Sequence, residues 1–138
     1  MKIIVDTNVI LDFLLLREPH TTDTKKLFKK ISQGEVEAFT TASSATDIYY
    51  IVAKRLGNNT ARQTIKHLFN ILGIIAVDGD DCISALNLPI ADFEDALIIV
   101  CANRKDINYI VSNDREFLKA DKRFASVVDI RTFLDFVE

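Results

Sequence analysis

The stretch KIIVDTN, residues 2–8, predicts the fold class of this chain. A short apolar run that stops at Asp-Thr-Asn is typical of a buried strand leading into a helix. The apolar residues 8–16 continue that helix. In parallel α/β sheets, ligand sites form beyond the carboxyl ends of the strands. Asp6, which follows the strand directly, is therefore the first candidate site residue.

The same alternation of strands and helices continues to the end of the chain. Further strands are predicted at residues 36–41, 73–77, 108–112 and 126–130. Further helices are predicted at residues 21–33, from 43 to a stop at 57, at 60–72, 80–87, 92–104 and 115–119, and from 131. Alternating strands and helices favour a mostly parallel sheet covered on both faces. We therefore expect a single three-layer α/β/α domain, residues 1–138, with about five strands.

Composition excludes several classes of protein. Gly and Pro number only 4 and 2 in 138 residues, and 49% of residues are hydrophobic, so disorder is not expected. The net charge of −3 counts against a protein that coats long duplex DNA. Cys82 and Cys101 form no short-spaced pair, which favours free thiols. The apolar runs are far shorter than the roughly 18 residues of a membrane span, so we expect a soluble, cytoplasmic protein without membrane contact.

Four aspartates fall where the predicted sheet ends. Asp6 follows the first strand, Asp47 is placed in the first turn of the helix after the second, Asp95 opens the helix at 92–104, and Asp114 follows the fourth strand. Each alone is explained at least as well as a helix cap or a turn residue, because aspartate is common there. Asp47 also has capping-box spacing to Ser44.

As a set, the four carboxylates point to a metal site. Four acids at one edge, without enough basic residues in the same motifs to neutralise all of them, would repel one another unless cations lay between them. Ligands that are all oxygen select hard ions such as Mg²⁺ or Mn²⁺. His20 and His67 are isolated, so a zinc site is not indicated.

Three segments resemble the motifs of the PIN-domain ribonucleases. They are VDTNV at residues 5–9, DFEDA at 92–96 and VSNDREF at 111–117, and in this order they span most of the chain. The resemblance implies a PIN-like fold and cleavage of single-stranded RNA with Mg²⁺ or Mn²⁺. It implies catalytic roles for the four aspartates, with metal held by Asp6, Asp95 and Asp114.

The resemblance also assigns supporting residues. Asp92, three residues before Asp95 on the same helix face, is a candidate second-site metal ligand. Asn8 and Ser112 would orient Asp6 and Asp114. Position 47 departs from the family pattern, in which glutamate is common, and the shorter aspartate reaches less far.

Substrate and protein partners follow from charge and from the same resemblance. Arg115, beside Asp114, and Lys54, on the Asp47 face of its helix, are the candidate RNA contacts, whereas the lysines of residues 25–30 are read as a solvated face. Small proteins of this kind are similar to VapC-type toxins, which implies an antitoxin partner and a homodimer. Tyr50 and Ile51 fall off the apolar stripe of their helix, and core packing is preferred over an interface.

Two alternatives remain open. A haloacid-dehalogenase-type phosphatase also uses an aspartate at the end of a strand, but Asn8 stands where that family has a second aspartate. A PIN-like module that binds RNA or protein without cutting it is the other alternative, because of the departure at Asp47.

Overall fold

The computed structural model describes all residues 1–138, folded around one parallel sheet. The strands are β1 (Lys2–Val5), β2 (Glu37–Thr41), β3 (Leu72–Ile75), β4 (Tyr109–Val111) and β5 (Val127–Val128), in the order β3-β2-β1-β4-β5. The helices are α1 (Thr7–Leu14), α2 (Thr21–Ser32), α3 (Ala42–Leu56), α4 (Asn58–Phe69), α5 (Gly79–Leu86), α6 (Phe93–Arg104), α7 (Arg115–Leu118) and α8 (Ile130–Val137). None of these helices is long and apolar enough to cross a lipid bilayer.

The first strand lies at the centre of the sheet, between β2 and β4. Its residues Ile3, Ile4 and Val5 are almost fully buried, as expected for a parallel strand covered on both faces. Val5 is in register with Val111, and the next backbone N–H, that of Asp6, donates to the Val111 carbonyl at 2.9 Å. The strand order reverses at β1, which makes the β1–β4 edge the topological switch point of the sheet.

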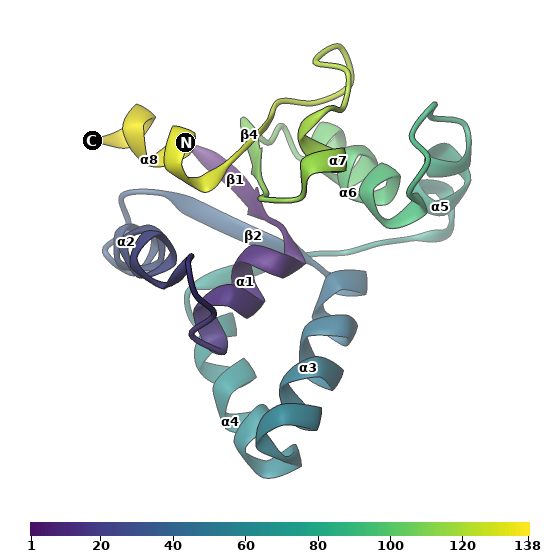
Figure 1. Cartoon of the computed structure of the whole chain (residues 1–138). Helices are drawn as coiled ribbons and strands as arrows, with labels where there is room; N and C mark the ends of the chain where they lie inside the picture. The colour runs from purple at the N-terminus through teal and green to yellow at the C-terminus, as the bar shows by residue number, and fades with distance from the viewer.

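Helices cover both faces of the sheet (Figure 1). The larger apolar core joins β1 and β2 to α1, α2, α3, α4 and α8. The second core joins β4 and β5 to α6 and α7 on the opposite face, and α5 packs on α6. Helices α3 and α4 pack as a hairpin that projects away from the sheet, and they meet at Gly57, whose φ of 87° favours glycine.

The predicted order of strands and helices is confirmed in full, and most boundaries differ by one to three residues. One boundary changes the site. Helix α3 begins at Ala42 and is capped by Thr41, whose hydroxyl accepts from the Ser44 N–H at 3.1 Å. Ser44 is therefore inside the helix, the expected capping box is absent, and Asp47 lies in the second turn rather than the first.

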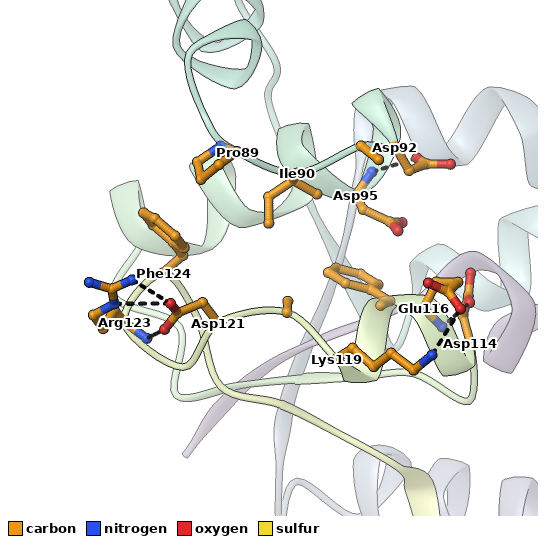
Figure 2. Close-up of a pocket in the computed structure, with 13 residues that line it drawn as sticks. Pro89, Ile90, Asp92, Asp95, Asp114, Glu116, Lys119, Asp121, Arg123 and Phe124 are labelled. Atoms are coloured by element: carbon orange, nitrogen blue, oxygen red, sulfur yellow. Dashed lines mark hydrogen bonds and ion pairs between the residues drawn. The ribbon is translucent and has the colours of Figure 1, made fainter.

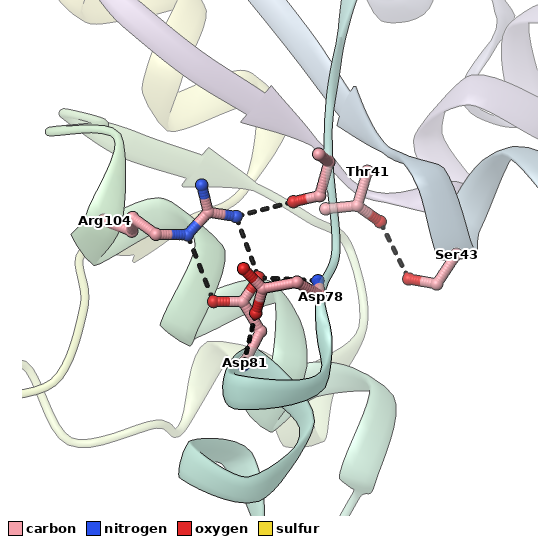
Figure 3. A network of polar contacts seen from close by, with 6 residues as sticks. Thr41, Ser43, Asp78, Asp81 and Arg104 are labelled. Carbon is pink, nitrogen blue, oxygen red and sulfur yellow. Dashed lines mark hydrogen bonds and ion pairs between the residues drawn. The ribbon is translucent and has the colours of Figure 1, made fainter.

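A network of hydrogen bonds stabilises the connection from β3 to α5, the helix that packs on α6 (Figure 3). Asp78 and Asp81 form a capping box at the start of α5, each accepting a hydrogen bond from the other's backbone N–H. Arg104, at the end of α6, donates to both carboxylate oxygens of Asp81, at 3.1 and 2.9 Å, and to the carbonyl of Ala76. The guanidinium therefore ties the loop after β3 and the start of α5 to α6.

Candidate active site

Three helix caps bring carboxylates to the carboxyl edge of the sheet. Asp6 caps α1 and accepts from the Thr7 N–H at 2.8 Å, Asp92 caps α6, and Asp114 caps α7. An aspartate can cap a helix and also belong to a metal site. The capping hydrogen bond uses one carboxylate oxygen, and the carboxylate keeps further lone pairs for other partners. Capping therefore fixes where these acids point, and the fold decides that they point to one place.

An acidic pocket of about 380 Å³ lies at this edge. Six of its ten lining residues are acids, and none is Lys, Arg or His; the acids are Asp6, Asp47, Asp92, Glu94, Asp95 and Asp114. All four aspartates first selected from the sequence are in this set, and so is Asp92. The other lining residues include Thr7, Asn8 and Tyr50.

Ser112 connects the ends of the two central strands. Its hydroxyl donates to Asp6 Oδ2 at 2.7 Å and accepts from the backbone N–H of Asp114 at 3.1 Å. The serine is fully buried, so this short chain of bonds is shielded from water. The partners of the Asp6 carboxylate are thus Thr7 and Ser112. Asn8 lies exposed at the pocket without a hydrogen bond to Asp6.

Crowding raises the pKa values of several of these acids. Burial, together with the charges of Asp92, Asp6, Asp114 and Glu94, raises the pKa of Asp95 to about 7. Burial, then the charge of Asp47, raises the pKa of Glu94. Burial also raises the pKa of Asp6, although the hydrogen bonds from Ser112 and Thr7 oppose that effect. The pocket is therefore a place where negative charge is costly without a counter-ion.

The donor set fits a hard divalent cation. Every charged group at the pocket is a carboxylate, and oxygen ligands of this kind are those that Mg²⁺ and Mn²⁺ select. As the side chains lie, no three acids converge closely enough to enclose one ion. Mg²⁺ commonly keeps several water molecules and uses one or two carboxylates, so the wider spacing suits it.

A second pocket of about 650 Å³ opens beside the acids (Figure 2). It shares Asp92, Asp95 and Asp114 with the acidic pocket. Its other walls come from residues 89–91, before α6, and from α7 and the loop that follows it. This second pocket is called the side pocket below.

The two basic residues selected from the sequence do not line either pocket. Arg115 is exposed on α7 and Lys54 is exposed on α3. The cations that do line one of these two pockets are Lys119 and Arg123, both at the side pocket. The sequence showed them only as charges in a segment without periodicity, so nothing marked them.

Glu94 is the acid that sequence reasoning missed. It lies one residue from Asp95 and therefore points in another direction on α6. In the structure it accepts a long hydrogen bond, 3.5 Å, from the Thr7 hydroxyl, across the β1–α1 and α6 segments. Its place within DFEDA was the available signal.

The preference for core packing of Tyr50 and Ile51 is wrong. Tyr50 is 68% exposed and Ile51 37% exposed. The two positions face outward from α3 beside the acidic pocket, which both of them line. They are thus free for contact with another molecule.

The fold and site together define a parallel α/β protein with an acidic pocket at its topological switch point. The chain belongs to the PIN domain family, whose model matches residues 2–116. It is 27% identical to Ribonuclease VapC1 of Aquifex aeolicus (strain VF5), over 99% of this chain and 94% of that protein.

Solved structures share the fold at low identity. The DNA-bound VapBC of Salmonella typhimurium superposes with a TM-score of 0.68 at 16% identity, over 94% of this chain and 98% of that chain. VapC20 of Mycobacterium tuberculosis, described as a sarcin-ricin loop cleaving toxin, gives 0.67 at 16% identity, over 83% and 92%. The expected PIN-like fold and the similarity to VapC toxins are confirmed.

Proposed function

We propose that this protein is an endoribonuclease dependent on Mg²⁺ or Mn²⁺, and the toxin of a toxin–antitoxin pair. The observation that carries the proposal is the acidic pocket: six carboxylates and no basic side chain at the switch point of the sheet. The similarity to Ribonuclease VapC1 supports RNA as the substrate. The absence of a clear counterpart to the dehalogenase second aspartate, together with membership in the PIN family, disfavours the phosphatase alternative.

Asp6, Asp95 and Asp114 are the proposed metal-holding residues. A divalent cation held there would lower the pKa of a bound water molecule and offset the charge that develops on the scissile phosphate. Asp6 is held in place by Ser112 and Thr7, and Asp114 by its cap on α7. Asp47, Asp92 and Glu94 line the rest of the pocket, where they would add negative charge or bind a second ion.

Removal of divalent cations is expected to abolish RNA cleavage. The purified protein is incubated with single-stranded RNA after chelation, and then with Mn²⁺ or Mg²⁺ restored. Cleavage should disappear and return, because the carboxylates alone supply no cation to activate a water molecule or to offset the charge on the phosphate. Calorimetric titration with Mn²⁺ shows whether the site binds metal at all, and together with the cleavage assay it separates an active enzyme from a non-catalytic module. Cleavage that persists in chelator would contradict the proposed metal dependence, and failure to cleave any RNA despite bound Mn²⁺ would favour the module.

Ser112→Ala is expected to reduce cleavage about 10- to 100-fold, the usual effect of removing a group that orients a metal ligand. The reason is the loss of the 2.7 Å bond that fixes Asp6 Oδ2. Mn²⁺ affinity, measured by calorimetry, should fall with it, which a purely structural serine would not cause. Ser126→Ala, at an exposed serine, is the matched control. Unchanged Mn²⁺ affinity in Ser112→Ala would remove the serine from this role.

A cognate antitoxin and a second copy of the chain are the proposed protein partners. The VapBC complexes among the similar structures support an antitoxin. An apolar groove of about 300 Å³ between α3 and α4 is a suitable surface, because Tyr50 lines both this groove and the acidic pocket. Co-purification with the product of the adjacent small reading frame tests the antitoxin. Light scattering of the isolated chain tests the homodimer.

A further inference from the structure

The side pocket has one apolar end and one acidic end. Figure 2 shows Pro89 and Ile90 on one wall, Phe124 with Arg123 on the opposite wall, and the carboxylates of Asp92, Asp95 and Asp114 at one end. At about 650 Å³ it is large enough for a small organic ligand. Its acidic end is also the acidic pocket, so a molecule in one lies next to the other.

The apolar end packs against the second core. Ile90 and Phe124 are half-buried and pack on the second core, and the fully buried Phe117 lies beneath them. Both side chains also line the side pocket. Flat aromatic groups fit between such walls, because stacking needs an apolar or aromatic face fixed in place.

The cation at this end, Arg123, is exposed and pairs with Asp121. Asp121 accepts from Nε and Nη2 of Arg123, at 3.0 and 2.7 Å, and from its backbone N–H at 2.9 Å. These bonds keep the guanidinium carbon 6.0 Å from the centre of the Phe124 ring. An arginine plane beside an aromatic ring is a platform on which unpaired nucleic-acid bases stack. Lys119, paired with Glu116, adds a second cation at the rim that a phosphate could engage.

We infer that the side pocket binds one unpaired base of the RNA substrate, next to the phosphate cleaved in the acidic pocket. The inference rests on the proposed function for its substrate, and on the side pocket for its location. Phe124 and Ile90 would enclose the base, and Arg123 would stack on or hydrogen-bond to it. The side pocket would then contribute to which RNA sequence is cut.

The test separates the base from the phosphate backbone. Affinity is measured for short single-stranded oligoribonucleotides and for versions in which one base at a time is replaced by an abasic ribose. The protein is Asp6→Asn, which cannot cut and which leaves the side pocket unchanged, because Asp6 does not line it. Phe124→Ala is added to this background, and Phe136→Ala, at an exposed ring on α8, is the matched control.

One abasic position is expected to weaken binding about 5- to 100-fold, the range for one stacked base. Phe124→Ala should cause a similar loss and should make that abasic position neutral, since both changes remove the same contact. Phe136→Ala should change neither. In the cutting enzyme, Phe124→Ala should broaden the bases found beside the cut in sequenced products.

Other results would overturn the inference. If Phe124→Ala keeps the full abasic penalty, the base binds elsewhere, and the proposed ribonuclease stands if the wild-type chain still cuts RNA. If Phe124→Ala leaves RNA binding unchanged but weakens antitoxin co-purification, the side pocket is a protein-docking surface. If Asp6→Asn binds no RNA and the wild-type chain cuts none, both the inference and the proposed function fail. If RNA binding depends on one base but the wild-type chain does not cut RNA, the inference about the side pocket stands and only the proposed ribonuclease activity is rejected.

Discussion

Asp95→Asn is expected to lower RNA cleavage at least about 100-fold, because even residues that only orient a metal ligand cost 10–100-fold. Asp95 lies where the acidic pocket and the side pocket meet, and its carboxylate is surrounded by other acids. Asparagine keeps the shape and removes the charge, so the loss would reflect cation binding rather than packing. The measurement is the cleavage rate at saturating Mn²⁺.

The same substitution is expected to stabilise the protein when divalent cations are absent. The pKa of Asp95 is about 7 in the folded chain, against about 3.9 for an unperturbed aspartate. Between these values the folded state binds a proton that the unfolded state does not, so stability falls as the pH rises from about 4 to about 7. Because the carboxylate is only half-buried, solvent screening reduces the effect to about 1–2 kcal/mol.

Urea unfolding in chelator, at several pH values, measures this effect. The Asp95→Asn variant should be more stable than the wild-type chain above pH 7 and should lose less stability as the pH rises. Asp135→Asn, at an exposed aspartate on α8, should leave the pH dependence unchanged. Equal pH dependence in Asp95→Asn and the wild-type chain would show that burial and the neighbouring acids do not raise the pKa of Asp95.

Arg104→Ala is expected to lower the melting temperature by at least about 5 °C, one of the larger effects available to a single substitution in a domain of this size. Burial raises the pKa of Asp81, but hydrogen bonds from Arg104 and from Asp78 outweigh it and hold that pKa below its usual value. Without the guanidinium, the Asp81 carboxylate, 4% exposed, keeps a buried charge that has lost its partner.

Two comparisons isolate the buried pair. Arg131→Ala removes an exposed arginine that pairs with Asp23 at 3.4 Å, and it should change the melting temperature little. Adding Asp81→Asn to Arg104→Ala should recover part of the loss, because the unpaired charge is then absent while the capping box can still form. Equal effects of Arg104→Ala and Arg131→Ala would show that burial adds nothing to the pair.

Local patterns in the sequence were enough to predict the layered architecture. Apolar runs at β1, β3 and β4 and the helical spacing between them depend on neighbours within a few residues. The order of all thirteen elements therefore follows from the sequence, with boundary shifts of one to three residues. One boundary shift matters for the site: Thr41, and not Ser43 or Ser44, caps α3. The sequence offers threonine and serine side chains at all three positions, and only the backbone conformation decides which of them is the cap.

Four acids of the site, Asp6, Asp92, Asp95 and Asp114, were also accessible from the sequence, because each belongs to a short motif at the end of a strand or the start of a helix. Asp6, Asp92 and Asp114 are caps, as the local pattern favours, and Asp95 follows Asp92 by three residues. What the motifs could not show is which acids share a pocket with which neighbours. The composition of the pocket depends on the pairing of β1 with β4, two strands that are more than 100 residues apart in the sequence.

Sequence by itself thus determined the parallel fold, the edge of the sheet that carries the site, and the aspartates placed there. Only the tertiary structure decided that Ser112 bonds to Asp6, that Glu94 joins the acids, and that Lys119 and Arg123, rather than Arg115 and Lys54, line the adjoining side pocket. The reason is physical: strand and helix periodicity is encoded locally, whereas burial, repulsion between carboxylates and the walls of a pocket arise between segments that only folding brings together.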